Sequence, residues 1–113
     1  MMKPENHISF LKQLLGLAVE EVFWDGELLG LSFSDGWKLT IYNRFAYRIG
    51  ADMVSTFQLL KGAFLVQAEE FHDHAVLKFT EDQELKIDLT DDGFCGPEAM
   101  QLTGSSGEII VWN

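Results

Sequence analysis

A histidine pair is the first group of residues in this chain that could do chemistry. His72 and His74 flank Asp73, and residues two apart on a β-strand share a face, so the pair could hold a metal ion with Glu70 as a third ligand. The internal repeat described below places this segment at a turn, and no cysteine or third histidine is near it in the sequence. We therefore interpret the segment as a solvated turn rather than a metal site, and we expect no cofactor.

Cys95 is the only cysteine of the chain, which excludes an internal disulfide and indicates a reducing compartment. The carboxylates of Asp91, Asp92 and Glu98 near it would oppose formation of the reactive thiolate. The chain opens without a basic and apolar leader, and no apolar run approaches the length of a membrane span. These features predict a cytoplasmic protein in which Cys95 is a small packing residue.

The acidic residues are concentrated in one part of the sequence. The net charge is −10, and ten of the eighteen Asp and Glu residues lie between Glu69 and Glu98. This charge argues against binding to nucleic acid or to an anionic membrane surface. The segment is either a solvated surface or an electronegative surface that steers a basic protein partner. The candidate contact residues for such a partner are Glu81, Asp82, Asp88, Asp91 and Asp92. The spacing of these acids does not match a calcium-binding EF-hand loop.

These residues are carried by a pattern that occurs twice in the sequence. The segment Leu29–Ile41 (LGLSFSDGWKLTI) returns 46 residues later as Ala75–Ile87 (AVLKFTEDQELKI). Apolar residues alternate with polar ones in both segments, which is typical of a β-hairpin with one face buried. The chain is therefore predicted to contain one supersecondary unit written twice.

The register of each hairpin follows from its alternation. A three-residue loop places Phe33 opposite Trp37 in the first copy and Phe79 opposite Gln83 in the second, with the apolar residues on one face. A two-residue turn would mix apolar and polar side chains on both faces. The three-residue loop also puts Gly36 and Asp82 in the left-handed conformation.

Each copy is predicted to begin with a short helix and a first strand. The first copy has a helix from about Pro4 or Glu5 to Leu15, followed by a strand at residues 17–24. The second copy repeats this order with a helix at Met53–Lys61 and a strand at residues 63–71.

Two further segments complete the chain. Residues Asn43–Ala51 alternate in polarity and are either a strand or an aromatic loop over the core. Residues 100–113 are predicted to form a closing hairpin, in which Ile109–Trp112 is apolar enough to be buried.

The predicted fold class is α+β, in one domain spanning residues 1–113. Its helix-plus-three-strand unit (αβββ) occurs at about residues 7–43 and 53–89, and forms antiparallel sheets related by a pseudo-twofold axis. Most of the aromatic residues occupy in-register strand positions, so we interpret them as core residues rather than a ligand cage. They are Trp24, Trp37, Phe45, Tyr47 and Trp112.

The two hairpins, the Gly96-Pro97-Glu98-Ala99-Met100 turn and the terminal IIVW segment resemble a loose group of small, uncharacterised bacterial proteins. These proteins share an L-x-F-x-D-G-x-x-L-x-I hairpin and a late G-P-E-A segment. Some comparable acidic proteins are immunity partners of bacterial toxins, which is what the resemblance implies here. The shared motifs are turn and strand signals, and no functional residue is transferred by them.

Two function classes follow from the sequence. The first is a non-catalytic protein-binding module, such as an immunity-type inhibitor of a basic partner. The second is a small-molecule-binding or catalytic protein that uses a pocket between the two repeats. The sequence leaves homo-oligomer formation open in both.

Overall fold

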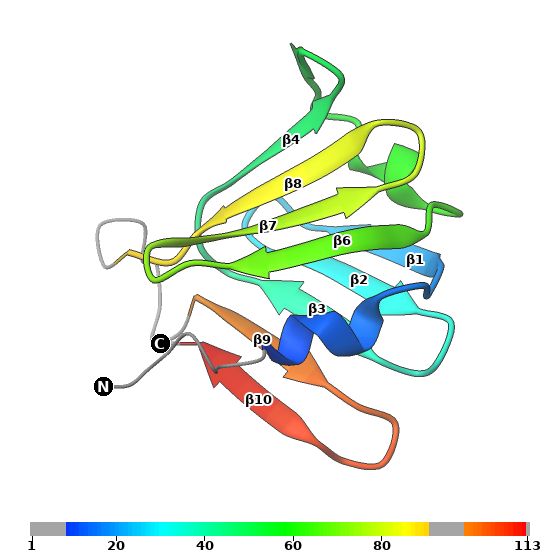
Figure 1. Ribbon diagram of the computed structural model, residues 1–113, viewed down its shortest axis with the longest axis vertical. Coiled ribbons are helices and arrows are strands. Elements are labelled where there is room, and N and C mark those ends of the chain that lie inside the picture. Colours follow the sequence, from blue (N-terminus) through cyan, green and yellow to red (C-terminus); the bar gives the residue numbers. More distant parts are fainter. Residues whose placement is uncertain (1–8, 91–98, 113) are drawn as a thin grey trace.

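The computed structural model describes residues 9–90 and 99–112 as two five-stranded antiparallel sheets packed face to face (Figure 1). The first sheet has the strand order β1 (Val19–Trp24), β2 (Leu29–Phe33), β3 (Lys38–Ile41), β9 (Met100–Thr103) and β10 (Ile109–Trp112). The second has the order β5 (Asp52–Met53), β4 (Phe45–Ile49), β8 (Gln83–Asp88), β7 (His74–Phe79) and β6 (Leu65–Glu70). Among these residues, no helix is long and apolar enough to cross a membrane.

The predicted α+β class is wrong, because the two helical segments are single 3₁₀ turns in a mostly β protein. They are η2 (Phe10–Leu14) and η3 (Phe57–Leu60). Glycines with positive φ follow both turns, Gly16 at +84° and Gly62 at +92°, and stop them before a longer helix can form. The predicted helix Met53–Lys61 fails at its start, since Met53 pairs with Arg48 in β5. The predicted start of the first helix lies outside the described residues.

The predicted hairpin register is confirmed in both copies. Leu31 lies opposite Leu39 in the first hairpin, and the Phe33 N–H donates to the Trp37 carbonyl over 2.7 Å. Phe79 lies opposite Gln83 in the second. Gly36 has φ +86° and Asp82 has φ +60°, so both loops end in the left-handed conformation that the alternation requires.

Hydrogen bonds at the junction of the two sheets recur with the 46-residue spacing. The Gly16 N–H donates to the Leu65 carbonyl, and the Gly62 N–H donates to the Val19 carbonyl, both over 2.8 Å. Strand β1 also has a register shift between Val19 and Glu21, which β6 repeats at the equivalent residues. The starts of β1 and β6 are thus bonded to each other and connect the two sheets along one edge.

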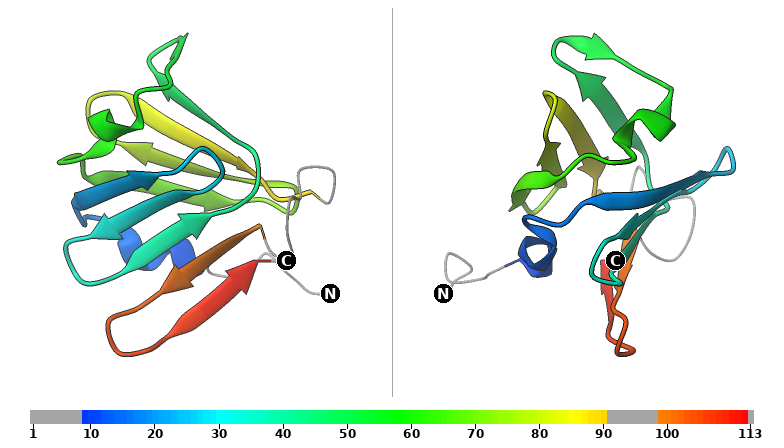
Figure 2. Two further views of the ribbon diagram at one scale, coloured as in Figure 1. Left: turned by 180° about the vertical axis from the view of Figure 1, so that it is seen from behind. Right: turned by 90° about the vertical axis from the view of Figure 1, so that its right-hand side faces the viewer.

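Each sheet exchanges a strand with the other. Strand β4 follows β3 in the chain but pairs with β8, whereas β9 follows β8 and pairs with β3 (Figure 1). The exchanged strands occupy matching places, because Phe45 faces Ile87 as Met100 faces Ile41. Each three-strand meander is therefore extended by the hairpin that follows the other copy, and the β4–β5 and β9–β10 hairpins lie at opposite ends of the molecule (Figure 2). The segment Asn43–Ala51, left open by the sequence, contains this crossing strand.

The core lies between the sheets and uses equivalent residues from both copies. These include Leu14 and Leu60, Leu31 and Leu77, Phe33 and Phe79, Leu39 and Leu85, and Ile41 and Ile87, all buried. Each Å² of apolar surface that is removed from water stabilises the fold by about 25 cal/mol, so this buried layer is the main source of stability.

The closing hairpin forms as β9 and β10, but the predicted burial of Ile109–Trp112 is wrong. Strand β10 is the edge of its sheet, and its side chains alternate between the core and the outside. Ile109 is 64% exposed, and Val111 is 39% exposed. Ile110 and Trp112 face inward and pack against the core.

Candidate functional site

His72 lies in the turn between β6 and β7, where the repeat places the pair, and His74 is the first residue of β7. The Nδ1 atom of His74 is 2.7 Å from Oδ1 of Asp73, and its ring stacks on Phe71 with a centroid distance of 4.5 Å. The hydrogen bond to His74 is the main cause that lowers the pKa of Asp73. The described part of the chain contains no group of three His, Cys, Asp or Glu side chains placed to hold a metal ion. The arrangement therefore anchors the His74 ring and gives no support to a metal site at His72 and His74.

The predicted acidic contact residues do not gather in one place among the described residues. Glu81 and Asp82 are exposed at the β7–β8 turn, whereas Asp88 ends β8 at the opposite end of that strand. A strand of this length spans roughly 20 Å at 3.3 Å per residue. Asp91 and Asp92 lie outside the described residues, as does Cys95.

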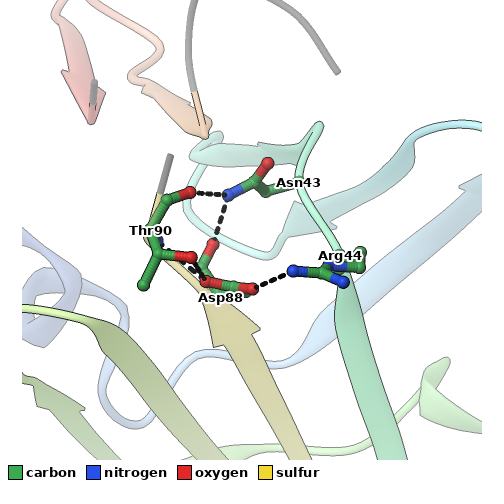
Figure 3. Close-up of polar contacts among 4 residues, drawn as sticks. All are labelled: Asn43, Arg44, Asp88 and Thr90. Carbon is green, nitrogen blue, oxygen red and sulfur yellow. Dashed lines mark hydrogen bonds and ion pairs between the residues drawn. The ribbon is translucent and has the colours of Figure 1, made fainter. Parts of the chain in front are cut away.

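Asp88 instead belongs to a polar cluster where β8 ends beside the start of β4 (Figure 3). Its Oδ1 accepts hydrogen bonds from the Thr90 N–H (2.8 Å) and from Thr90 Oγ1 (2.6 Å). Its Oδ2 is 3.1 Å from a guanidinium nitrogen of Arg44. The hydrogen bonds from Thr90 are the largest cause that lowers the pKa of Asp88, and Arg44 contributes further. The Arg44 charge is thus already paired within the chain.

Asn43 connects this cluster to the crossing strand. It is 2% exposed, and its Nδ2 donates to the carbonyls of Asp88 (2.6 Å) and Thr90 (3.2 Å). Two carbonyl acceptors fix the orientation of the amide. Its Oδ1 points away from these residues in Figure 3 and meets no hydrogen-bond donor among the residues that the structure describes, which is uncommon for a buried polar atom.

An aromatic cleft opens between the sheets on the other side of Asn43 and Arg44. It has a volume of about 880 Å³, and its walls come from the ends of β1 and β3, from β4 and β5, and from η3. The walls include Trp24, Glu27, Asn43, Arg44, Phe45 and Phe57. Pockets of this size and apolar character are typical of ligand sites.

Three rings form the apolar wall of this aromatic cleft. Trp24 meets Phe57 at a centroid distance of 4.9 Å and Phe45 at 5.6 Å, both edge to face, and Phe45 meets Phe57 at 5.3 Å. Trp24 is 41% exposed. The interpretation of the aromatic residues as core holds for the buried Tyr47 and is wrong for Trp24, which lies at the surface of the cleft.

A second, smaller pocket of about 430 Å³ shares Arg44 and Phe45 with the aromatic cleft. Most of its lining residues carry polar or charged groups, and these include His74, Asp73, Lys86 and Thr90. Each of its carboxylates already contacts a partner, Asp73 with His74 and Asp88 with Arg44 and Thr90. The two pockets therefore flank the start of β4, and the smaller one is lined by carboxylates that are already paired within the chain.

The sequence proposed a pocket between the two repeats but not the residues of the aromatic cleft, because these come from segments that the sequence does not place together. One signal was present: the Asn43-Arg44 pair interrupts the alternating apolar pattern between Ile41 and Phe45. No family model, curated protein or solved structure matches this chain.

Proposed function

We propose that this chain is a binding protein whose ligand occupies the aromatic cleft. The observation that carries the proposal is the exposed ring of Trp24 beside Phe45 and Phe57 in a pocket of about 880 Å³. Exposed aromatic surface in a concave site gains free energy when a ligand covers it.

The test is an NMR titration of the labelled chain with neutral aromatic probes such as indole and naphthalene. We expect the amide shifts to be confined to residues that line the cleft. Trp24→Ala should weaken binding about tenfold or more, as expected for loss of an aromatic contact of 1.4 kcal/mol or more. Phe64→Ala is the matched control, because Phe64 is 49% exposed but does not line the cleft. Shifts spread over the whole surface, or equal binding by both variants, would contradict the proposal.

The acidic surface is a second candidate, and Glu81 and Asp82 favour it. Both side chains are exposed at the tip of the β7–β8 hairpin, on a chain of net charge −10. In this candidate, the turn contacts a basic protein partner in the cytoplasm, with Asp91 and Asp92 as further contacts. Reversal of both turn charges to lysine should slow association with that partner, and the effect should fade as the salt concentration rises. A rate that is independent of salt would exclude it.

A further inference from the structure

The two ends of the molecule have equivalent strand orders, but only the end with β9 and β10 has an edge strand that pairs along its whole neighbour. We call this the filled end. Strand β9 pairs with β10 through all four of its residues, from Met100 opposite Trp112 to Thr103 opposite Ile109. The equivalent strand β4 pairs with β5 only through Arg48 and Ile49. Within the described residues, no strand lies beside Phe45 and Ala46 on that side, and the aromatic cleft lies there instead. We call this part of β4, residues 45–46, the open edge.

The open edge presents backbone hydrogen-bonding groups to the aromatic cleft. The Asp88 N–H donates to the Arg44 carbonyl over 2.9 Å, so Arg44 forms a hydrogen-bonded pair with β8. Because these groups alternate in direction along an antiparallel strand, those of Phe45 point away from β8. The Tyr47 carbonyl points the same way and accepts the Val54 N–H over 2.9 Å. A strand added beyond Val54 would therefore continue a hydrogen-bond ladder that already exists.

The filled end shows what a strand at this place contributes. The indole Nε1 of Trp112 donates to a carboxylate oxygen of Glu70 over 2.9 Å. The backbone carbonyl of Trp112 accepts the Ala99 N–H over 2.7 Å. Glu70 ends β6 as Trp24 ends β1, 46 residues earlier. The side chain at the place of Trp112 would therefore meet the Trp24 ring in the cleft rather than a carboxylate. An apolar or aromatic side chain without a required N–H donor fits this place.

The charge at the rim of the aromatic cleft favours a basic segment. Arg44 is paired with Asp88, which leaves the exposed carboxylate of Glu27 at the rim, on a chain of net charge −10. A lysine or arginine next to the seated apolar residue would complement this field.

On the basis of the proposed function, we propose that the aromatic cleft binds an extended, basic peptide segment of a partner protein, which adds a strand to the open edge. Its backbone pairs with Phe45, and one apolar or aromatic side chain packs on Trp24, Phe45 and Phe57. In this mode of recognition, backbone hydrogen bonds supply affinity and side-chain pockets supply specificity. A peptide segment of three or four residues is long enough to lie along the open edge, because it spans about 10–13 Å at 3.3 Å per residue.

The probe is the peptide acetyl-Lys-Ile-Ile-Val-Phe-Lys-amide, which copies Ile109–Val111 of β10 and replaces Trp112 with phenylalanine. Binding to the full chain is measured by quenching or enhancement of tryptophan fluorescence and by NMR, with Trp24→Ala and Phe64→Ala as the cleft and control variants. We expect hydrogen-exchange protection of the Phe45 amide, a loss of affinity of about tenfold in Trp24→Ala, and no change in Phe64→Ala.

Three comparisons decide the outcome. A peptide N-methylated on the N–H groups that face β4 should bind at least about tenfold more weakly, since it loses the ladder but keeps its side chains. A peptide with glutamate in place of both lysines should also bind more weakly than the lysine peptide. In the Glu27→Gln variant of the protein, the affinities of these two peptides should differ less. Equal binding by the N-methylated peptide, or no peptide binding while indole still binds, would overturn strand addition and leave the proposed function intact. Failure of both peptide and indole to bind would overturn both.

Discussion

The two ends of this molecule are built on the same strand order and differ in what covers the exchanged strand. At the filled end, β10 pairs along the whole of β9, and Trp112 donates to Glu70. At the open end, β5 covers two residues of β4, and Trp24 stands in the place of Glu70 beside a cleft of about 880 Å³. A shortened edge strand, together with the change from a carboxylate to an indole, therefore distinguishes a closed end from a candidate binding site.

The comparison separates the residues that stabilise the fold from those that make the site. The buried positions are nearly the same in both copies, as Leu31 and Leu77 illustrate, because each sheet must cover the other. The residues that differ lie at the strand ends and turns, where burial imposes fewer constraints. We expect substitutions in the first group to affect stability equally at both ends, and those in the second group to affect one end only.

The largest expected effect tests the equivalence of the two cores. Leu31→Ala and Leu77→Ala each remove a fully buried side chain and should each lower the free energy of unfolding by about 2–5 kcal/mol. Because the two leucines occupy matching places opposite Leu39 and Leu85, the two losses should agree within about 1 kcal/mol. Urea unfolding followed by circular dichroism measures both. A difference of several kcal/mol would show that the two halves of the core are not equivalent in energy.

The next prediction uses the two hairpin loops, in which the same conformation is carried by different residues. Gly36→Val places a β-branched side chain at φ +86°, with its Cβ 2.6 Å from that of Ser105, and should cost about 1–3 kcal/mol. Asp82→Gly should change stability by less than about 1 kcal/mol, because relief of the left-handed strain is offset by the flexibility of glycine in the unfolded chain. The same unfolding experiment checks both variants. A loss for Asp82→Gly as large as that for Gly36→Val would refute this account of the loops.

The hairpin register could be predicted from sequence, because a one-residue slip would move Leu31 and Leu39 to the solvent face. The helices could not, because the same short apolar spacing fits the 3₁₀ helices of five and four residues that the structure forms before Gly16 and Gly62. The strand exchange could not be predicted from the sequence either. Alternation in residues 45–49 identifies a strand but does not indicate which sheet the strand joins.

The aromatic cleft was missed for a related reason. Phe45 and Trp24 occupy strand positions that alternation assigns to the core, and only the shortness of β5 leaves them at a cavity. The length of an edge strand depends on where the chain leaves the sheet after Met53. The sequence pattern carries no clear sign of that departure, which is why the open edge became visible only in the structure.

A smaller effect is expected at the polar contact that closes the filled end. Trp112→Phe keeps an aromatic ring but removes the indole N–H that donates to Glu70, and should cost about 1 kcal/mol. The matched change at the open end is Trp24→Phe, which keeps the contacts with Phe45 and Phe57 and should cost less than half as much. Thermal and urea unfolding of both variants measure the difference. Equal losses would mean that the Trp112–Glu70 hydrogen bond contributes little to closing this end.

The smallest effect concerns pH and again distinguishes the two ends, because Asp88 ends β8 where Tyr42 follows β3 in the other copy. Hydrogen bonds from Thr90, and then Arg44, lower the pKa of Asp88 in the folded protein below its value in the unfolded chain. The unfolded chain therefore takes up the proton at a higher pH than the folded protein, so protonation favours unfolding. The stability that Asp88 contributes is present above its unfolded pKa of about 3.9 and is lost as the pH falls through its folded pKa.

Asp88→Asn should accordingly be less stable than the natural chain at pH 7, and the difference in the free energy of unfolding should narrow steadily below about pH 4. Tyr42→Phe is the control at the equivalent place and should give a gap that does not vary over this range, since this change removes no carboxyl group. A pH-independent gap for Asp88→Asn would contradict the role assigned to the polar cluster at the start of β4.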